Sequence, residues 1–130
     1  VFTVNHIHKG IIKDAHHTSA KYDGTVSEFN KTNLKSEYKE QFKAPYVKDC
    51  LVQIGCRLIN EYYIKENDCR HIIGQIEALH IADNLLDDDG WLNLEAAKTV
   101  TVNGLDGYAL PTLLDRFDYA RPDKDVNSIL

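Results

Sequence analysis

The sequence predicts a mainly β fold, a β-rich α+β arrangement in which strands joined by turns build a barrel and the helices are short and peripheral. Apolar and polar residues alternate along residues 51–59, and residues 71–83 form a second strand-like stretch. Clusters of turn-forming residues separate these stretches. Segments with helical spacing are few and short, which favours strands as the main elements.

Length and composition narrow the class of protein. The 130 residues suffice for one hydrophobic core, so we expect a single domain spanning 1–130. Hydrophobic residues make up 43% and charged residues 27%, as in ordinary globular chains. No apolar run approaches the ~20 residues of a membrane span. A net charge of -5 offers no basic field for a nucleic-acid backbone.

The three cysteines are an odd number without CxxC spacing. This pattern fits reduced thiols in a cytosol better than a disulfide framework. We therefore expect a cytoplasmic protein with no membrane or nucleic-acid partner.

The first part of the chain predicts four elements. Alternation predicts a short strand over residues 2–5, and apolar or small residues at helical spacing predict a short helix within 10–22. Residues 23–41 are polar and predict an extended connection with a helical turn or two. Pro45 precedes a new apolar segment and predicts that the next element starts there.

The clearest strand lies at residues 51–59 and can continue around a bend through 62–64. Turn residues at 65–69 lead into the strand within 71–83, which carries apolar residues on both faces. A strand buried on one side by a barrel core and on the other by a helix or a second subunit has this pattern.

The last third predicts shorter elements. An acidic turn at 86–90 is followed by a predicted short helix over 92–100. Two glycines frame a loop within 102–110, and residues 116–120 predict a final strand.

The acidic stretch LDDDGWLNLE suggests a calcium loop at first reading. If Gly90 takes the glycine position, Asp87 and Asp89 take two ligand positions, but the first position is Leu85 and the closing position is Ala96. We interpret the stretch as a solvated turn before the next element.

Histidines raise the question of zinc. His6 and His8 are two residues apart, so both would face one side of a strand, and His16 and His17 follow. No third or fourth ligand follows at a spacing diagnostic of a zinc site. The alternative interpretation is that these histidines lie on the surface or in loops. We expect no metal site.

No catalytic or phosphate-binding motif stands out: G-x-S-x-G, the P-loop and G-x-G-x-x-G are all absent. Lys43 lies at a chain reversal, His80 at a strand end and Tyr108 after a glycine turn. At the rims of barrel strands they could line a pocket for a planar anionic ligand. From the sequence pattern alone, the simpler interpretation is that these three residues lie at the strand rims and bind no ligand.

Read in order, the segments resemble the flavin reductase-like family, the FMN-binding split barrels that include flavoredoxins and small NAD(P)H:flavin oxidoreductases. The similar stretches are FTVNHIHKGIIKDAHHTSAKY, SEFNKTNL, FKAPYVKDCLVQIGCRL, HIIGQIEALHIADNLLDDDGWLNLE and GLDGYALPTLLDRFDYARP. Their order and spacing carry the resemblance rather than any single motif.

The resemblance implies a six-stranded Greek-key split barrel that works as a homodimer and holds FMN noncovalently near the subunit interface. In the family, a segment before the FTVN-like strand supplies the opening barrel strands and a Ser/Thr-rich loop around the flavin phosphate. This sequence starts after that segment, so we expect a domain that lacks its N-terminal strands.

When the binding positions of the family are carried over to this sequence, the resemblance implies four cofactor-binding residues. Asn5 would lie near the flavin ring, Lys43 would face the anionic flavin or its phosphate, and His80 would approach the ring or the nicotinamide. Tyr108 would border the pocket of the second substrate.

The implied reaction is hydride transfer from NAD(P)H to the flavin, which strictly requires no protein acid or base, so we expect no catalytic residue in that sense. Electrons would pass to free flavin, a metal chelate or a partner monooxygenase. Two alternatives remain, a non-catalytic flavin-binding electron carrier and a truncated remnant that dimerises without cofactor.

Overall fold

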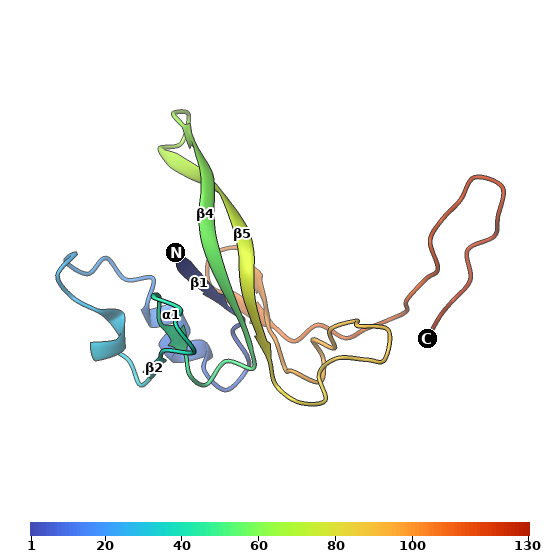
Figure 1. Ribbon diagram of the computed structural model, residues 1–130, viewed down its shortest axis with the longest axis horizontal. Helices are drawn as coiled ribbons and strands as arrows, with labels where there is room; N and C mark the ends of the chain where they lie inside the picture. The colour runs from blue at the N-terminus through green and yellow to red at the C-terminus, as the bar shows by residue number, and fades with distance from the viewer.

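A computed structural model describes residues 1–130 and shows a mainly β chain, as predicted (Figure 1). In chain order the elements are β1 (Phe2–Asn5), α1 (Ile12–His17), the 3-10 turn η1 (Glu28–Asn30), β2 (Ser36–Glu37), β3 (Tyr46–Val47), β4 (Val52–Ile64), β5 (Cys69–Ile81), β6 (Thr101–Asn103) and β7 (Gly107–Ala109). The α-helix has six residues. None of the helices is long and apolar enough to cross a membrane.

Three antiparallel strands form the central sheet in the order β1-β4-β5, and two small hairpins, β2-β3 and β6-β7, accompany it. Asn5 lies opposite Gln53, which lies opposite His80. Directly opposed residues project from the same face of a sheet, so these three side chains form one row. The sheet is open, because β1 and β5 are both edge strands.

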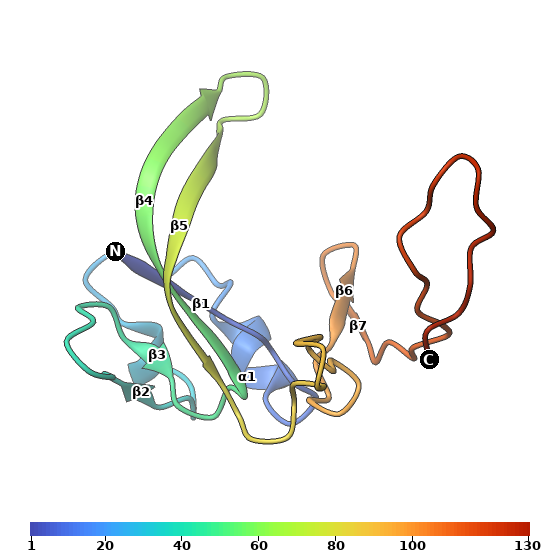
Figure 2. The same cartoon turned by 45° about the vertical axis from the view of Figure 1, so that its right-hand side comes forward.

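Strands β4 and β5 have thirteen residues each and rise out of the body as a long curved hairpin (Figures 1 and 2). The predicted strands over 51–59 and 71–83 are confirmed, and β4 continues through 62–64. Two register irregularities interrupt the β4–β5 pairing, one after Gly55 and one after Leu58, and only the second lies next to the predicted bend. The hairpin carries exposed apolar residues on both strands.

The two faces of the sheet meet different neighbours. On one face, Val52 packs with Leu85 and Ala97 in the apolar core. On the other face, Tyr46 of β3 covers Gly55, and its ring contacts His80 edge to face with the centroids 5.1 Å apart. Only nine of the 130 residues are buried, so this core is small.

The helix predicted over 92–100 is wrong. The chain makes a single turn, in which the N–H of Ala97 donates to the carbonyl of Asn93 at 3.1 Å, and Lys98 then adopts a positive φ of 54°. Beyond it, the N–H of Val100 donates to the carbonyl of Ile7 at 3.0 Å. Pairing with the segment after β1 therefore replaces the second helical turn.

The strand predicted over 116–120 is also wrong. This stretch makes isolated bridges, between Phe117 and Ser128 and between Arg121 and Lys124. The chain returns through Pro122, which cannot donate a backbone hydrogen bond. No further strand lies alongside, so the alternating residues have no sheet to join.

The acidic turn is confirmed as a turn. Gly90 has a φ of 81°, and its N–H donates to the carbonyl of Asp87 at 2.8 Å. Arg116 reaches the turn from far along the chain: its guanidinium contacts the carboxylates of Asp87 and Asp89 and lies 4.6 Å from the centre of the Trp91 ring. These aspartates therefore bind an arginine.

Candidate functional site

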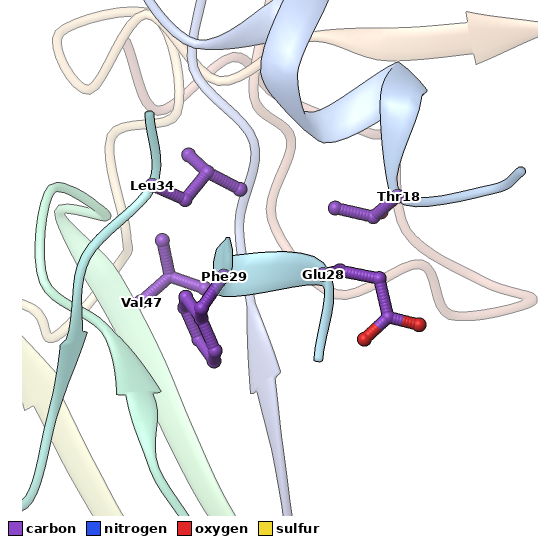
Figure 3. A pocket seen from close by; sticks show the side chains of 5 residues that line it. All are labelled: Thr18, Glu28, Phe29, Leu34 and Val47. Carbon is purple, nitrogen blue, oxygen red and sulfur yellow. The ribbon is translucent and has the colours of Figure 1, made fainter. Parts of the chain in front are cut away.

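A groove lies between α1, η1 and the β2-β3 hairpin, and we call it the α1 groove. Its outer part is a cavity of about 290 Å³ lined by Thr18, Glu28, Phe29, Leu34 and Val47 (Figure 3). An inner cavity of about 210 Å³ shares three of these residues and adds Asn5, Ile7, Ile11, Ala15 and Cys50. Together the two cavities fall within the size typical of small-molecule sites, about 300–1,000 Å³.

Helix α1 supplies one wall because of its spacing. Ile11, Ala15 and Thr18 recur at intervals of four and three residues, which places them on one side of a helix. The carboxylate of Asp14 accepts the backbone N–H of Asn33 at 2.9 Å and its side-chain amide at 3.2 Å. This contact ties the segment that carries the buried Leu34 to the helix.

Asn5 builds the inner end of the groove. Its Oδ1 accepts the backbone N–H of Val47 at 3.1 Å, and its Nδ2 donates to Oγ1 of Thr3 at 3.0 Å. Thr3 in turn donates to the carbonyl of Pro45 at 2.7 Å. Strands β1 and β3 are thereby held together, and Asn5 lines the cavity.

The chemistry of the α1 groove is largely apolar. Among the lining residues only Glu28 carries a charge, and Asn5 and Thr18 supply the polar groups besides Cys50. Burial raises the pKa of the Cys50 thiol to about 11, with a smaller contribution from Asp49. The lining suits a flat, mostly apolar ring and offers no cation to a phosphate.

A polar pocket lies where β4 begins and β5 ends. Its volume is about 240 Å³, and it is lined by Lys39, Lys48, Cys50, Leu51, Gln53, His80, Ile81 and Ala82. Cys50 lines both the polar pocket and the inner cavity of the α1 groove, so the two cavities are neighbours.

Gln53 organises this pocket from a position only 1% exposed. Its Oε1 accepts Lys39 Nζ at 2.6 Å, and its Nε2 donates to Glu37 at 3.0 Å and to the carbonyl of Val47 at 2.7 Å. The hydrogen bond from Gln53, assisted by Lys39, holds the pKa of the Glu37 carboxyl below its usual value. Gln53 therefore makes three of the four hydrogen bonds open to its amide, all of them within the chain.

His80 and Tyr46 are the unsatisfied members of this region. Nε2 of His80 and the hydroxyl of Tyr46 are both buried without a hydrogen-bond partner. Burial raises the pKa of the Tyr46 phenol. A Cβ placed on Gly55 would lie 2.5 Å from the Tyr46 hydroxyl, so the ring requires glycine beneath it. Unpaired buried polar atoms are uncommon in folded proteins, which makes these two atoms candidates for contact with a ligand or an ordered water molecule.

The remaining two predicted site residues lie elsewhere. Tyr108 is in β7, and its hydroxyl lies 3.0 Å from Nδ1 of His16, which attaches the β6-β7 hairpin to α1. Lys43 is exposed on the connection between β2 and β3. The structure thus brings Asn5 and His80 into one row through Gln53, while Tyr108 and Lys43 lie outside that row.

Three of the four histidines considered for zinc, His8, His16 and His17, have contacts within the chain, whereas Nδ1 of His6 is buried without a partner. Nε2 of His8 lies 3.0 Å from the carbonyl of Asp49, and Nε2 of His17 lies 2.9 Å from the hydroxyl of Tyr22. No group of three or more potential metal ligands converges in the structure.

Sequence reasoning missed Gln53, Thr18 and Phe29 as residues of these cavities. A glutamine within the strand LVQIGCRLI was the available indication for Gln53, since a buried amide needs several partners. Thr18 and Phe29 lie in stretches that carried the family resemblance, but their convergence depends on how the tertiary structure places α1 and η1 around one cavity.

The family described as "Flavin reductase like domain" matches residues 1–94. A curated but uncharacterized protein from Aquifex aeolicus (strain VF5) is 26% identical over 99 residues, which cover 76% of this chain and 50% of that protein.

Solved structures give a closer likeness. A split-barrel domain protein from Shewanella frigidimarina NCIMB 400, named as a candidate flavin reductase, matches with a TM-score of 0.87 and 37% identity over 91% of this chain and 60% of its own. Nitrilotriacetate monooxygenase component B from Bacillus cereus matches in fold, with a TM-score of 0.75 and 21% identity, over 90% of this chain and 58% of its own. The split-barrel fold class is confirmed, and the chain spans 50 to 60% of the proteins it matches.

Proposed function

The chain belongs to the flavin reductase-like domain family, and from that premise we propose that it forms part of an FMN-binding oxidoreductase that takes electrons from NAD(P)H. The observation that carries the proposal is the α1 groove, an apolar cavity of suitable size in a chain of this family. Bound flavin would supply the redox chemistry by accepting a hydride.

The groove fits one part of FMN. Its apolar walls, among them Phe29, Leu34 and Val47, suit the isoalloxazine ring, and Asn5 offers an amide to a ring edge. Its single charged side chain, Glu28, does not suit a phosphate. The phosphate therefore requires donors outside the groove, and Lys43 is our candidate for one of them.

His80 and Tyr108 are proposed to bind the cofactor or the nicotinamide. The support for His80 is its buried and unpaired Nε2 beside a pocket. The support for Tyr108 is its position against α1, where its hydroxyl contacts His16. The protein's task in this reaction is to orient the two rings and exclude water, so we propose no catalytic acid or base.

We further propose a homodimer that passes electrons to an acceptor such as free flavin, a metal chelate or a partner monooxygenase. The open sheet and the small core support a second subunit. A neighbour in fold is named as a component of a monooxygenase, which supports the last acceptor.

The test is spectroscopic and uses the full-length parent protein. The protein is incubated with FMN, desalted, and mixed anaerobically with NADH or NADPH. A yellow protein that bleaches supports the oxidoreductase. A yellow protein that does not bleach indicates an electron carrier instead, and a colourless protein would refute flavin binding.

A further inference from the structure

The polar pocket differs from the α1 groove in its charge. The β2-β3 hairpin lies beside the base of the β4–β5 hairpin (Figures 1 and 2), and two lysines close to the ends of its strands, Lys39 and Lys48, line the pocket. No carboxylate lines it. The α1 groove has the opposite character, because its one charged lining residue is Glu28. Positive charge at a cavity favours an anionic ligand.

Lys39 is held by contacts that leave it a free donor. Its Nζ donates to Oε1 of Gln53 at 2.6 Å and lies 3.2 Å from Oε1 of Glu37. An ammonium group has three N–H donors, so one of them remains for a ligand. Gln53 is buried and is itself fixed by its hydrogen bonds to Glu37 and to the carbonyl of Val47. The ammonium group is thereby positioned before a ligand arrives, which lowers the entropic cost of binding.

Lys48 has no competing partner. It is exposed and takes part in none of the ion pairs of the structure. Two carboxylates are near, those of Glu37 and Asp49, but neither lines the pocket, and Glu37 is occupied by Gln53 and Lys39. An anion in the pocket would therefore meet two ammonium groups and no carboxylate.

The size of the pocket and its histidine narrow the ligand further. Its volume of about 240 Å³ is below the ~300–1,000 Å³ typical of sites for whole small molecules, so it suits one group of a ligand or a small ion. His80 also lines the pocket, and its Nε2 has no partner within the chain. An imidazole with its proton on Nε2 is one more donor for an oxyanion.

We propose that the polar pocket binds a phosphate group, with Lys39 and Lys48 supplying the positive charge. A phosphate monoester carries a charge of about -1.5 to -2 at pH 7, so it matches two ammonium groups. A carboxylate carries a single negative charge and would leave one lysine uncompensated. Lysine binds phosphate as a point charge and does not need the planar geometry that arginine provides.

The proposed function supplies two carriers of such a group, the 2′-phosphate of NADPH and the phosphate of FMN. The choice between these carriers rests on that function, whereas the phosphate site itself does not. The polar pocket adjoins the inner cavity of the α1 groove at Cys50, so a ligand with its ring in the groove has the pocket as a neighbour. Free inorganic phosphate is the third source of the same chemistry.

The experiment measures the affinity of the full-length protein for three phosphate probes at constant ionic strength. NADPH is compared with NADH, and FMN is compared with riboflavin, each by fluorescence titration. Inorganic phosphate is titrated alone and followed by phosphorus NMR. The probe that loses affinity when the pocket lysines are replaced identifies the source: the dinucleotide, the flavin or the free ion.

The first variant is Lys48→Gln, because this exposed side chain can be changed without disturbing the fold. It should weaken binding of that phosphate probe roughly fivefold, as for one exposed charged contact, and leave NADH and riboflavin unaffected. Lys39→Gln should weaken binding roughly tenfold. The control Lys21→Gln/Lys65→Gln removes two lysines that line neither cavity and should bind every probe like the wild type. Circular dichroism checks that each variant folds.

The proposal is overturned if folded Lys48→Gln binds all three phosphate probes as tightly as the wild type. It is equally overturned if the control variant loses as much affinity as the pocket variants, since the effect would then belong to the overall charge. Failure of the proposed function is recognised separately, because a protein that binds neither flavin nor nicotinamide still gives a result with inorganic phosphate.

Discussion

Oδ1 of Asn5 accepts the backbone N–H of Val47 at 3.1 Å, and this contact joins the end of β1 to β3 at the wall of the α1 groove. The two residues are far apart in the chain but line the same cavity. One side chain therefore supports both the fold and the wall of the candidate site.

Replacement of Asn5 by Ala should lower the free energy of unfolding by about 1–3 kcal/mol, because the N–H of Val47 loses its acceptor. Urea denaturation of the full-length protein measures this. Asn5→Asp, which keeps an acceptor, should lose less. Asn60→Ala, on the exposed hairpin, is the control and should change little. Equal stability of Asn5→Ala and Asn60→Ala would contradict the assigned role.

Gly55→Ala should destabilise the protein by roughly 1–3 kcal/mol, as expected for overpacking. The new methyl group would meet the Tyr46 hydroxyl at 2.5 Å and the Phe42 ring at 2.9 Å. Gly24→Ala is the matched control, because a Cβ there meets nothing within 4 Å. Thermal and urea unfolding should separate the two variants. Similar stability would show that the Tyr46 ring does not lie over Gly55.

Lys43→Ala should weaken FMN binding by on the order of 1–2 kcal/mol, as for the loss of one charge-assisted contact. Quenching of flavin fluorescence in a titration of the full-length protein measures the affinity. Lys65→Ala, at the exposed tip of the β4–β5 hairpin, removes the same charge away from the groove. If both variants bind FMN like the wild type, Lys43 is not part of the site.

The ion pair between Asp89 and Arg116 predicts a pH dependence. The hydrogen bond from Arg116 holds the pKa of the Asp89 carboxyl below its ordinary value of 3.8. The contribution of Asp89 to stability is therefore complete above pH 3.8 and is lost as the pH falls through the lowered pKa. Asp89→Asn should be less stable than the wild type near neutral pH and equally stable at the acid end.

The control for this prediction is Asp88→Asn, which changes a neighbouring exposed carboxylate. Its unfolding midpoint should match that of the wild type near neutral pH. If Asp88→Asn loses as much stability as Asp89→Asn, the effect belongs to the charge of the turn and not to the Arg116 contact.

Thiol reactivity should distinguish the cysteines. Cys69 is exposed, Cys50 and Cys56 are buried, and burial raises the pKa of Cys50 to about 11. Since the thiolate is the reactive form, one thiol per chain should react rapidly with Ellman's reagent near pH 8. Cys69→Ser should abolish the rapid phase. A rapid phase that persists in this variant would show that the small core opens readily.

Local pattern was enough for the long strands. Val52, Ile54 and Leu58 alternate with polar or small residues, and β4 contains all of them. Helix α1 and the turn at Gly90 were also predicted, because each depends on residues adjacent in the chain. The resemblance found across several segments agrees with the family match over residues 1–94.

The candidate site was less accessible to sequence reasoning. Asn5 was predicted for the site and lines the α1 groove, but Thr18 and Phe29 were not singled out. The roles of Lys43 and His80 in flavin binding stay predictions, because the contacts of these residues within the chain do not identify a ligand.

By itself, the sequence determined the strand pair β4–β5, the turns and the family, because side-chain alternation and turn chemistry act over a few neighbouring residues. Tertiary structure decided the rest. It ended the turn near Lys98 by pairing Val100 with Ile7, and it left residues 116–120 without a sheet. It also aligned Asn5, Gln53 and His80, because backbone hydrogen bonds between distant strands set which residues share a face.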